Sequence, residues 1–329
     1  MLTEINSTDI TRSLINQDYI YTFACHENER ELCSLELHAL FGSRLEMDSD
    51  LRSYVRSSIC IPPGRSPFVH GRLGVISEAD SVNDLLPAAA KIELLPEETF
   101  KVVCLKEGDH MLDYEHSRQL EREVGMCIKG KAQMKHPKVT FGLIQTGRKW
   151  ILGQWTEADR SWHSHQQKPQ NYSTGFGVAL ARSLVNIAVP NILNQRLLDP
   201  CCGMGTVVIE ALSMGIEARG NDLNPLAIQG ARINLPHFGY DPACLTLGDM
   251  NELEGSYDAA ILDMPYNLCS VLPDEDQRVM LTSLRRLAKR AVVVSTEWVE
   301  GHLLAAGWEV NQYCAVRKGT FIRHVWLCT

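Results

Sequence analysis

A short glycine-containing turn between an apolar strand and a helix constrains this chain more than any other stretch. The turn follows Leu197-Leu198-Asp199-Pro200 and contains Gly203 and Gly205, and a helix is expected from Thr206 to Leu212. Glycine has no Cβ and tolerates positive φ, so backbone N–H groups at such a turn can approach a ligand closely. Thr206 is expected to cap the helix. The pattern predicts a nucleotide cradle.

Three further segments are expected to be short strands, each of which ends in an acid. They cover residues 217–222, 244–249 and 257–263, and they end in Asp222, Asp249 and Asp263. In a doubly wound α/β sheet, ligands bind at the carboxyl ends of the strands, where Asp199 also falls. We expect Asp222 to accept hydrogen bonds from ribose hydroxyls and Asp249 to accept one from an adenine amino group.

The rest of the C-terminal half alternates helices and strands. The expected elements are a helix over 274–290, a strand over 291–295, a helix over 299–306, and two strands over 308–316 and 320–327. Strands that alternate with helices indicate an α/β fold with a largely parallel sheet. A sheet that ends in such a pair of strands looks like a known variant of the doubly wound sheet, in which the last strand enters antiparallel.

The N-terminal half also mixes strands and helices. Asn28 can cap the first of its helices, and Pro87 is expected to kink the second or move its start. The expected strands cover 19–24, 57–61, 99–105, 139–145 and 150–155, and the expected helices cover 28–41, 80–92 and 114–128. A polar segment over 157–170 is expected to be a linker. This half is expected to be α/β as well.

A run of cations without acids occupies residues 128–156. Its members are Lys129, Lys131, Lys135, Lys138, Arg148 and Lys149. The net charge of −8 argues against nucleic-acid binding by the chain as a whole, so the charge must be read locally. Such a run is often only a solvated surface. Because these cations flank a strand and its return, they are candidate phosphate contacts.

Composition excludes several classes of protein. The 11 cysteines lack Cys-x-x-Cys spacing, which indicates reduced thiols rather than a disulfide framework or a zinc site. The start of the chain shows no signal-peptide pattern, and no apolar run is long enough to cross a membrane. His163 and His165 alone are too few for a zinc site. We therefore expect a cytoplasmic protein with no metal and no membrane association.

Several motifs together resemble a known enzyme family. Asp-Pro-x-Cys-Gly-x-Gly-Thr at 199–206, Asn-Asp-Leu-Asn-Pro at 221–225 and Asp-Met-Pro-Tyr at 263–266 resemble the S-adenosylmethionine-dependent amino-methyltransferases of nucleic-acid bases. The segments 168–174 and 180–188 make the chain most similar to the THUMP-domain tRNA guanine-N2 methyltransferases, whose usual target is guanosine 10. The resemblance covers 168–329 specifically and the first 155 residues only by order of elements.

The resemblance implies a fold, a cofactor, a substrate and a set of site residues. It implies a Rossmann-like methyltransferase domain over 171–329, a linker over 157–170, a THUMP-like RNA-binding domain over 79–156 and a ferredoxin-like region over 1–78. S-adenosylmethionine is the implied cofactor, tRNA the implied partner, and a monomer or homodimer the expected assembly. The implied cofactor-binding residues are Tyr172, Thr174, Asp199, Pro200, Gly203, Gly205, Thr206, Asp222, Leu223, Asp249 and Met250.

The implied catalytic residues are Asp263, Pro265 and Tyr266. An exocyclic base amine is a poor nucleophile because its lone pair is delocalised into the ring. Asp263 and a backbone carbonyl of Met264-Pro265 can each accept an amino proton, which favours a tetrahedral, more nucleophilic nitrogen. Tyr266 offers a flat face on which an extruded base can stack.

One position departs from the family pattern and leaves the base open. Met264 stands where the family usually has a first proline, and Asp-Met-Pro-Tyr-Asn-Leu also resembles Asn-Leu-Pro-Tyr-Asn-Ile of the rRNA adenine N6-dimethyltransferases. Adenine N6 in rRNA or DNA is therefore an alternative to guanine N2 in tRNA. A small-molecule methyltransferase and a non-catalytic RNA-binding protein are further alternatives, and the number of methyl groups transferred is open.

Overall fold

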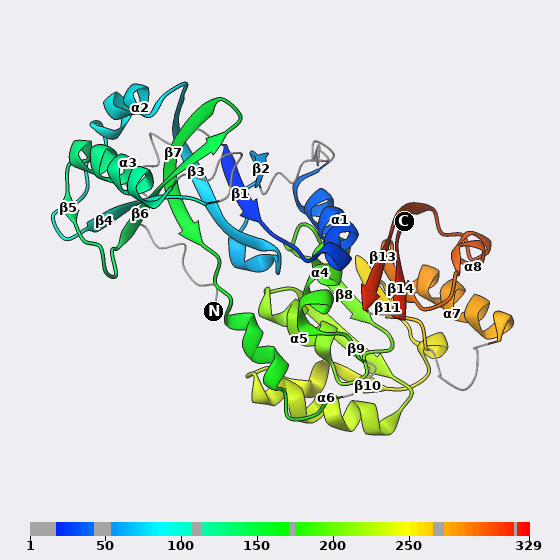
Figure 1. The fold of residues 1–329 in the computed structure, drawn as a ribbon. Coiled ribbons are helices and arrows are strands. Elements are labelled where there is room, and N and C mark those ends of the chain that lie inside the picture. Colours follow the sequence, from blue (N-terminus) through cyan, green and yellow to red (C-terminus); the bar gives the residue numbers. More distant parts are fainter. Residues whose placement is uncertain (1–17, 43–53, 107–112, 172–174, 266–272, 319–320) are drawn as a thin grey trace. The chain divides into compact units, whose positions relative to one another are not determined.

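A computed structural model describes residues 18–42, 54–106, 113–171, 175–265, 273–318 and 321–329. The chain divides into two compact units (Figure 1). The N-terminal unit comprises Met1–Ala24, Glu46–Gly64 and Phe68–Asp159, and the C-terminal unit comprises Cys25–Leu45, Arg65–Pro67 and Arg160–Thr329. The fold is mixed α/β in both units, as expected from the sequence.

The N-terminal unit is built on one sheet with the strand order β2-β1-β3-β7-β6-β4-β5. Its strands are β1 (Tyr19–Phe23), β2 (Tyr54–Ser57), β3 (Val69–Ala79), β4 (Thr99–Cys104), β5 (Lys131–Ala132), β6 (Val139–Thr146) and β7 (Lys149–Glu157). Helices α2 (Val82–Ala89) and α3 (Tyr114–Cys127) pack on one face, where Leu85 and Val124 meet Phe100 and Phe141.

Two expectations for this unit were wrong. The strand expected over 57–61 covers Tyr54–Ser57 instead, and the long strand β3 was not expected. Gly71 and Gly74 interrupt its alternation of side chains, yet at Gly71 a Cβ would overlap the Trp155 ring. Because β3 pairs with both β1 and β7, a domain limit at residue 78 falls inside a strand.

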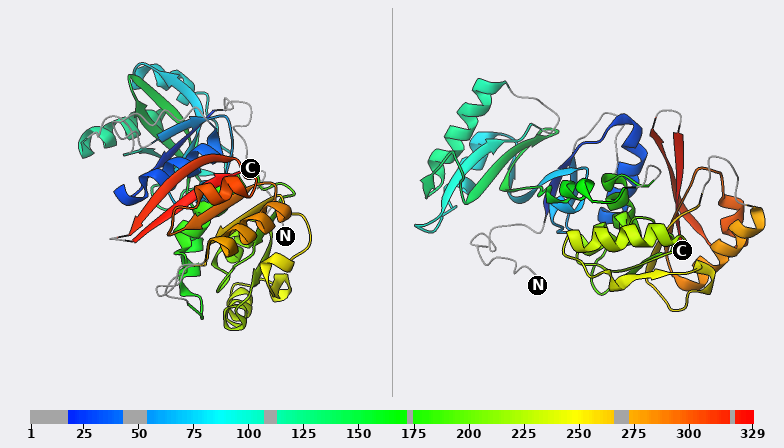
Figure 2. Two further views of the ribbon diagram at one scale, coloured as in Figure 1. Left: turned by 90° about the vertical axis from the view of Figure 1, so that its right-hand side faces the viewer. Right: turned by 90° about the horizontal axis from the view of Figure 1, so that it is seen from below.

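The C-terminal unit holds a second sheet with the strand order β10-β9-β8-β11-β12-β14-β13. The strands are β8 (Arg196–Asp199), β9 (Glu217–Asp222), β10 (Leu245–Leu247), β11 (Ala259–Asp263), β12 (Ala291–Ser295), β13 (Val310–Lys318) and β14 (Phe321–Cys328). The first five run parallel, and β14 lies antiparallel between β12 and β13. Figure 2 shows β13 and β14 as a long red hairpin. The antiparallel last strand is confirmed.

Helices cover both faces of this sheet. They are α4 (Val178–Ala188), α5 (Thr206–Ser213), α6 (Pro225–His237), α7 (Asp274–Leu287) and α8 (Glu300–Ala305). Helices α7 and α8 bury Leu281, Leu284 and Leu303 against Val293 and Trp326. Close packing on both faces explains why β11 and β12 read as unbroken apolar runs.

The first helix of the chain, α1 (Arg30–Phe41), belongs to the C-terminal unit although it follows β1 in sequence. Asn28 does not cap it, because Asn28 lies in a short 3₁₀ turn that His26 caps instead. Three hydrophobic residues of α1, Leu32, Leu37 and Leu40, are almost fully buried. The helix is thus part of the core of the C-terminal unit.

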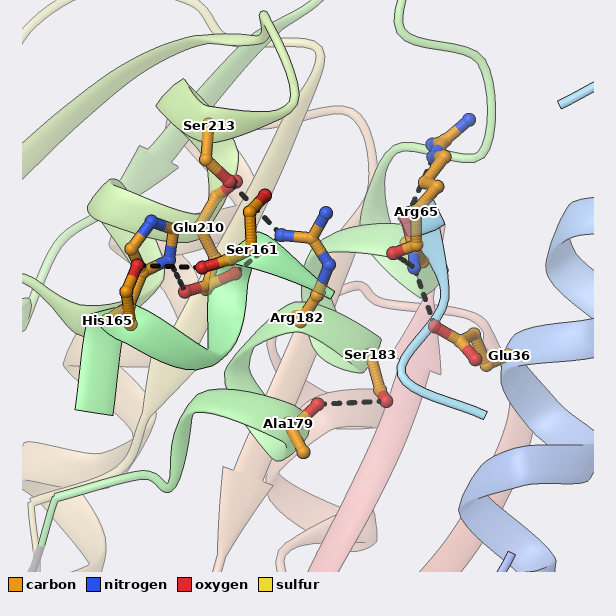
Figure 3. Close-up of polar contacts among 11 residues, drawn as sticks. Glu36, Arg65, Ser161, His165, Ala179, Arg182, Ser183, Glu210 and Ser213 are labelled. Carbon is orange, nitrogen blue, oxygen red and sulfur yellow. Dashed lines mark hydrogen bonds and ion pairs between the residues drawn. The ribbon is translucent and has the colours of Figure 1, made fainter. Parts of the chain in front are cut away.

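A buried polar network holds α1 in place (Figure 3). Glu36 is fully buried and accepts hydrogen bonds from Asn186 Nδ2 at 2.6 Å and Ser66 Oγ at 2.7 Å. Arg65 Nε donates to Asn186 Oδ1 at 2.9 Å, and its other nitrogens donate to the carbonyls of Val189 and Pro190. Burial raises the pKa of Glu36 to about 7, although its polar partners and Arg65 lower it. Asn186 joins the carboxyl group to the guanidinium.

Asn186→Ala should therefore destabilise the protein by roughly 2–4 kcal/mol, because it leaves both a buried carboxyl and a buried guanidinium short of a partner. Urea denaturation followed by tryptophan fluorescence measures the change. Asn191→Ala, at an exposed residue just after α4, is the matched control and should change stability by less than about 0.5 kcal/mol. Equal stability of the two variants would contradict the assigned role.

Candidate functional site

A cavity of about 620 Å³ opens at the carboxyl ends of strands β8 to β11. This is the edge at which doubly wound sheets bind ligands. Ten of the residues expected in the site line the cavity: Asp199, Pro200, Gly203, Thr206, Asp222, Leu223, Asp249, Met250, Asp263 and Pro265. Tyr172, Thr174 and Tyr266 lie outside the described residues. The sheet thus brings together side chains that are up to 66 residues apart in the chain (199 to 265).

The glycine turn is ordered by bonds within the chain. Gly203 N–H donates to Asp222 Oδ2 at 2.8 Å, and Gly205 N–H donates to the Cys202 carbonyl at 2.8 Å. The expectation that both N–H groups are available to a ligand is therefore not met in this structure. Thr206 is the first residue of α5 and not its cap, because Gly205 takes the cap position in a left-handed conformation.

The two glycines differ in what they face. Gly203 has φ +53°, and a Cβ there would meet no atom within 4 Å, so its backbone borders open space in the cavity. Gly205 has φ +79°, and a Cβ there would lie 3.0 Å from Leu235 Cδ1 of α6. Because Gly203 has no side chain, the cavity stays open at this point. Because Gly205 has none, α6 can pack against the turn.

Asp222 and Asp249 each form a hydrogen bond to the backbone and keep capacity for a ligand. Asp222 Oδ1 accepts from Asn224 N–H at 2.9 Å, and Asp249 Oδ1 accepts from Asn251 N–H at 2.9 Å. A carboxylate can accept about four hydrogen bonds, so both acids can bind hydroxyl or amino groups as well. Leu223, 70% exposed beside Asp222, gives the cavity an apolar wall.

Two acids of the cavity are held in unfavourable surroundings. Burial, together with the nearby Asp222 and Asp263, raises the pKa of Asp199 well above its usual range. Burial also raises the pKa of Asp263 to about 7, although the positive charge of Arg323 lowers it. Raised acid pKa values in a cavity are typical of functional sites.

Polar atoms in the cavity lack partners within the described chain. Asp263 Oδ1 and Asn251 Oδ1 are buried and form no hydrogen bond with any described residue. Buried polar atoms are nearly always paired, so each of these two oxygens is a candidate to accept a hydrogen bond from a ligand. The open space at Gly203, the acids at the strand ends and these two oxygens together fit a ligand that carries several hydroxyl and amino groups.

Arg323 and Phe176 are two residues of this region that the sequence did not reveal. The Arg323 guanidinium lies 5.4 Å from the ring centroid of Phe176 and 4.8 Å from that of Phe321. Arg323 shares the Asp263 face of the sheet, because Asp263 pairs with Val294, and Val294 pairs with Val325 two residues from Arg323. Only the pairing of β12 with β14 brings it there.

Lys168 also lines the cavity and was expected only as part of a linker. Burial lowers its pKa, although Glu210 raises it. The expected linker is in fact packed, because it contains a 3₁₀ helix over Ser161–Gln167 in which Trp162 and His165 are buried. The polar composition of this segment concealed its contacts with α5.

Glu210 of α5 contacts His165, the buried histidine of that segment (Figure 3). Its fully buried carboxyl accepts from Arg182 at 2.6 Å and contacts His165 Nδ1 at 2.5 Å. His165 therefore binds an acid of the helix that follows the glycine turn. No group of three or more metal-ligating side chains occurs among the described residues.

The structure explains why methionine, and not the proline of the related pattern, stands at position 264. Its side chain is buried in the core beneath α7, and its N–H donates to the Val294 carbonyl at 2.8 Å. A proline has no N–H and cannot form this bond. The methionine therefore extends the pairing of β11 with β12 by one residue beyond Asp263.

The six cations of the N-terminal unit are exposed but do not form one patch. Lys129, Lys131, Lys135 and Lys138 lie before β6, whereas Arg148 and Lys149 follow it. The eight residues of β6 separate the two groups by roughly 25 Å. Lys129 pairs with Glu93 at 3.4 Å and Lys149 with Asp80 at 2.8 Å, so acids from elsewhere in the chain offset two of the six charges.

Comparison with known proteins identifies the domain that carries the cavity. Residues 166–290 match the family described as RMKL-like, methyltransferase domain. This segment is similar to the methyltransferase domain of that family. It contains both the glycine turn and the strand that ends in Asp263, which confirms the resemblance drawn from those motifs.

Two curated relatives carry the same name, tRNA (guanine(10)-N2)-dimethyltransferase. The protein from Methanothermobacter thermautotrophicus is 30% identical over 162 residues, which cover 46% of this chain and 48% of that protein. The protein from Pyrococcus abyssi is 26% identical over 246 residues, which cover 70% of each chain. The chain thus matches about half the length of the first relative.

Among solved structures, TrmN from Thermus thermophilus is 20% identical and covers 94% of this chain and 99% of its own, with a TM-score of 0.46. A possible methylase from Clostridium difficile 630 is 16% identical with the same score.

None of the described helices is long and apolar enough to span a bilayer.

The carboxyl of Asp263, whose Oδ1 is buried without a partner among the described residues, should cost stability at neutral pH. Its pKa in the folded protein, about 7, lies above that of an unfolded aspartate, so ionisation opposes folding. The penalty is absent below about pH 4, grows by at most about 1.4 kcal/mol per pH unit, and is complete above pH 7. Asp263→Asn should therefore melt above wild type at pH 8 and less so at pH 5.

Asp258→Asn is the control for this measurement. Burial is slight there, and the Arg196 N–H, with Lys289 nearby, lowers the pKa of Asp258. Ionised Asp258 therefore favours folding, and its replacement should give no gain in melting temperature as the pH rises. A difference in melting temperature between wild type and Asp263→Asn that does not change with pH would show that Asp263 is not held in an unfavourable site.

Proposed function

We propose that the protein transfers a methyl group from S-adenosylmethionine to the exocyclic N2 amine of a guanine in tRNA. The observation that carries the proposal is Asp263, whose Oδ1 is buried in the cavity without a partner in the described chain. Such an oxygen can accept a hydrogen bond from a substrate amine. The methyltransferase family match over 166–290 and the names of the two curated relatives support the reaction and its substrate.

The cavity residues fit the cofactor. Asp222 and Asp249 would accept from its ribose hydroxyls and adenine amino group, and Leu223 would contact an apolar face of the adenine. The open backbone at Gly203 leaves room beside them. Bound S-adenosylmethionine would supply an electrophilic methyl group on its sulfonium.

The protein must mainly position the amine and accommodate its charge. Asp263 would accept a hydrogen bond from one amino N–H, and a carbonyl of Met264-Pro265 would accept one from the other. The ionised carboxylate offsets the positive charge that builds on nitrogen in the transition state, where removal of a single such interaction is costly. Arg323 lowers the pKa of Asp263, which increases the ionised fraction at neutral pH.

The finer assignments extend the same proposal. The target is a guanosine of the position-10 type, the N-terminal unit includes the THUMP-like RNA-binding region over 79–156, and the protein acts in the cytoplasm. Tyr266 stacks on the extruded base. The seven-stranded N-terminal sheet with α2 and α3 on one face supports a separate binding unit, because a small-molecule substrate would not need one.

Asp263→Asn should lower the single-turnover rate of tRNA methylation by a factor on the order of 10²–10³, because it removes the charge that stabilises the developing cation. Cofactor and tRNA affinities should stay near wild type, since neither ground state carries that charge. The wild-type rate should rise with pH through about 7, as the pKa of Asp263 requires. Nucleoside mass spectrometry of the product identifies the methylated base.

Asp274→Asn is the matched control for the rate measurement. Asp274 is 89% exposed in the first turn of α7 and does not line the cavity. Its replacement should leave the rate unchanged. A wild-type rate in Asp263→Asn would refute the assigned mechanism, and N6-methyladenosine as the product would replace guanine as the target.

Binding of tRNA should depend most on the cations without acidic partners. Lys131→Gln, Lys135→Gln and Lys138→Gln combined should lower the slope of log K against log salt by about 2, at roughly 0.7–0.9 for each phosphate that is no longer neutralised. Filter binding at several salt concentrations measures the slope. Lys129→Gln with Lys149→Gln, which removes cations paired with Glu93 and Asp80, should change it less. An unaltered slope in the triple variant would make these lysines a solvated surface only.

A further inference from the structure

An exposed aromatic cluster lies on the methyltransferase domain outside the cavity. It consists of Trp298, which follows β12, Tyr313 of β13 and His324 of β14, and we call it the aromatic rim. The ring centroids of Trp298 lie 5.0 Å from Tyr313 and 5.5 Å from His324, and Tyr313 and His324 lie nearly parallel, 5.9 Å apart at 21°.

We propose that the aromatic rim binds an unpaired nucleotide of the RNA substrate by stacking, outside the cavity that holds Asp263. The inference rests on the proposed function, because it assumes that RNA is the substrate. It adds a second contact surface on the catalytic domain, separate from the cations of the N-terminal unit.

The rim is rigid yet exposed. Trp326 is fully buried beneath it, with centroid distances of 5.6 Å to all three rings, and Tyr313 Oη bonds to His324 Nδ1 at 2.7 Å. In contrast, Trp298 is 56% exposed and Tyr313 is 40% exposed. Aromatic rings held in place with a free face are the feature on which single-stranded nucleic acids stack.

The pairing of the strands places the backbone of His324 near the carboxyl ends of the parallel strands, at the edge that carries Asp263. His324 pairs with Ser295 and Asp263 pairs with Val294, so the backbones of the two residues lie at nearly the same level, two strands apart. At about 4.8 Å per strand, these backbones are roughly 10 Å from each other. Because successive side chains alternate between faces and Val325 lies in the row of Asp263, the His324 ring lies on the opposite face of the sheet from the Asp263 side chain. An RNA strand that crosses this edge of the sheet would contact both faces.

The hairpin that carries the rim extends past the end of β12. The last pair of β12 with β14 joins Ser295 to His324, whereas β13 and β14 stay paired to Lys318 and Phe321. Residues 316–318 and 321–323 therefore project beyond the catalytic edge of the sheet. A chain bound at Asp263 would pass this hairpin.

The charge of the hairpin suits a phosphate backbone. Residues 310–328 contain three cations and no acid, and Arg317 lies on the same face of β13 as Tyr313. Two acids lie near the rim: Glu297, close to His324, and Glu31, which accepts from the Ala315 N–H. Burial and the charge of Arg317 lower the pKa of His324, so at neutral pH this ring is uncharged and can stack as a neutral aromatic.

The test is tRNA binding and methylation by the full chain carrying Trp298→Ala and Tyr313→Ala. The affinity for tRNA should fall by about 5- to 150-fold for each base stack removed. The affinity for S-adenosylmethionine and the single-turnover rate at saturating tRNA should remain at wild-type values, because Asp263 and the glycine turn are unaltered. Trp298→Phe keeps an aromatic face and should retain most of the affinity, which excludes misfolding as the cause.

Leu304→Ala is the matched control, because Leu304 is an aliphatic residue, 58% exposed on α8 of the same domain. It should leave tRNA affinity unchanged. Unaltered tRNA affinity in Trp298→Ala with Tyr313→Ala would overturn the inference. An equal loss in Leu304→Ala would also overturn it, since it would indicate a general apolar docking surface.

A second measurement separates this inference from the proposed function. An unstructured oligouridine of eight nucleotides should quench the tryptophan fluorescence of the wild type, and Trp298→Ala should abolish the quenching. The oligonucleotide contains no guanine, so this result does not depend on methylation. Quenching in a protein that does not methylate tRNA would refute the proposed function alone, whereas methylation without quenching would refute the aromatic rim alone.

Discussion

The structure depends on the convergence of carboxylates at one edge of a parallel sheet. Because β8, β9 and β11 run in the same direction, Asp199, Asp222 and Asp263 all lie at their carboxyl ends. Burial raises the pKa of both Asp199 and Asp263, and the nearby negative charges of Asp222 and Asp263 raise the pKa of Asp199 further. A cavity with such acids is less stable than a packed core, and this cost is typical of a functional site.

The surrounding structure limits this cost by fixing the groups that border the cavity. Asp222 bonds to the N–H groups of Gly203 and Asn224, so the second strand end orders the glycine turn. Beneath the turn, Glu210 is held by Arg182 and His165. Removal of one partner from a buried charged group is far more costly than an exposed ion pair would suggest. The cavity is therefore open but its walls are rigid.

Local sequence patterns predicted much of the C-terminal unit. The strands that end in Asp199, Asp222 and Asp263 were predicted because each ends in an acid before a turn or a helix, and two of them are apolar runs. The helix over Tyr114–Cys127 was found in the N-terminal unit for a similar reason, namely its regular apolar spacing. The strand β3 was missed because its glycines interrupt the alternation, and the reason for Gly71, its close approach to the Trp155 ring, is a tertiary contact.

The sequence by itself determined the order of strands and helices, the glycine turn and the acids that end the strands. These features depend on residues close together in the chain. Only the tertiary structure decided that α1 packs with the C-terminal unit, that His165 binds Glu210, and that Arg323 and the rings of Trp298, Tyr313 and His324 lie near the edge that carries Asp263. Each of these depends on strand pairing or burial between segments far apart in sequence, and no local pattern encodes which distant partner a side chain meets.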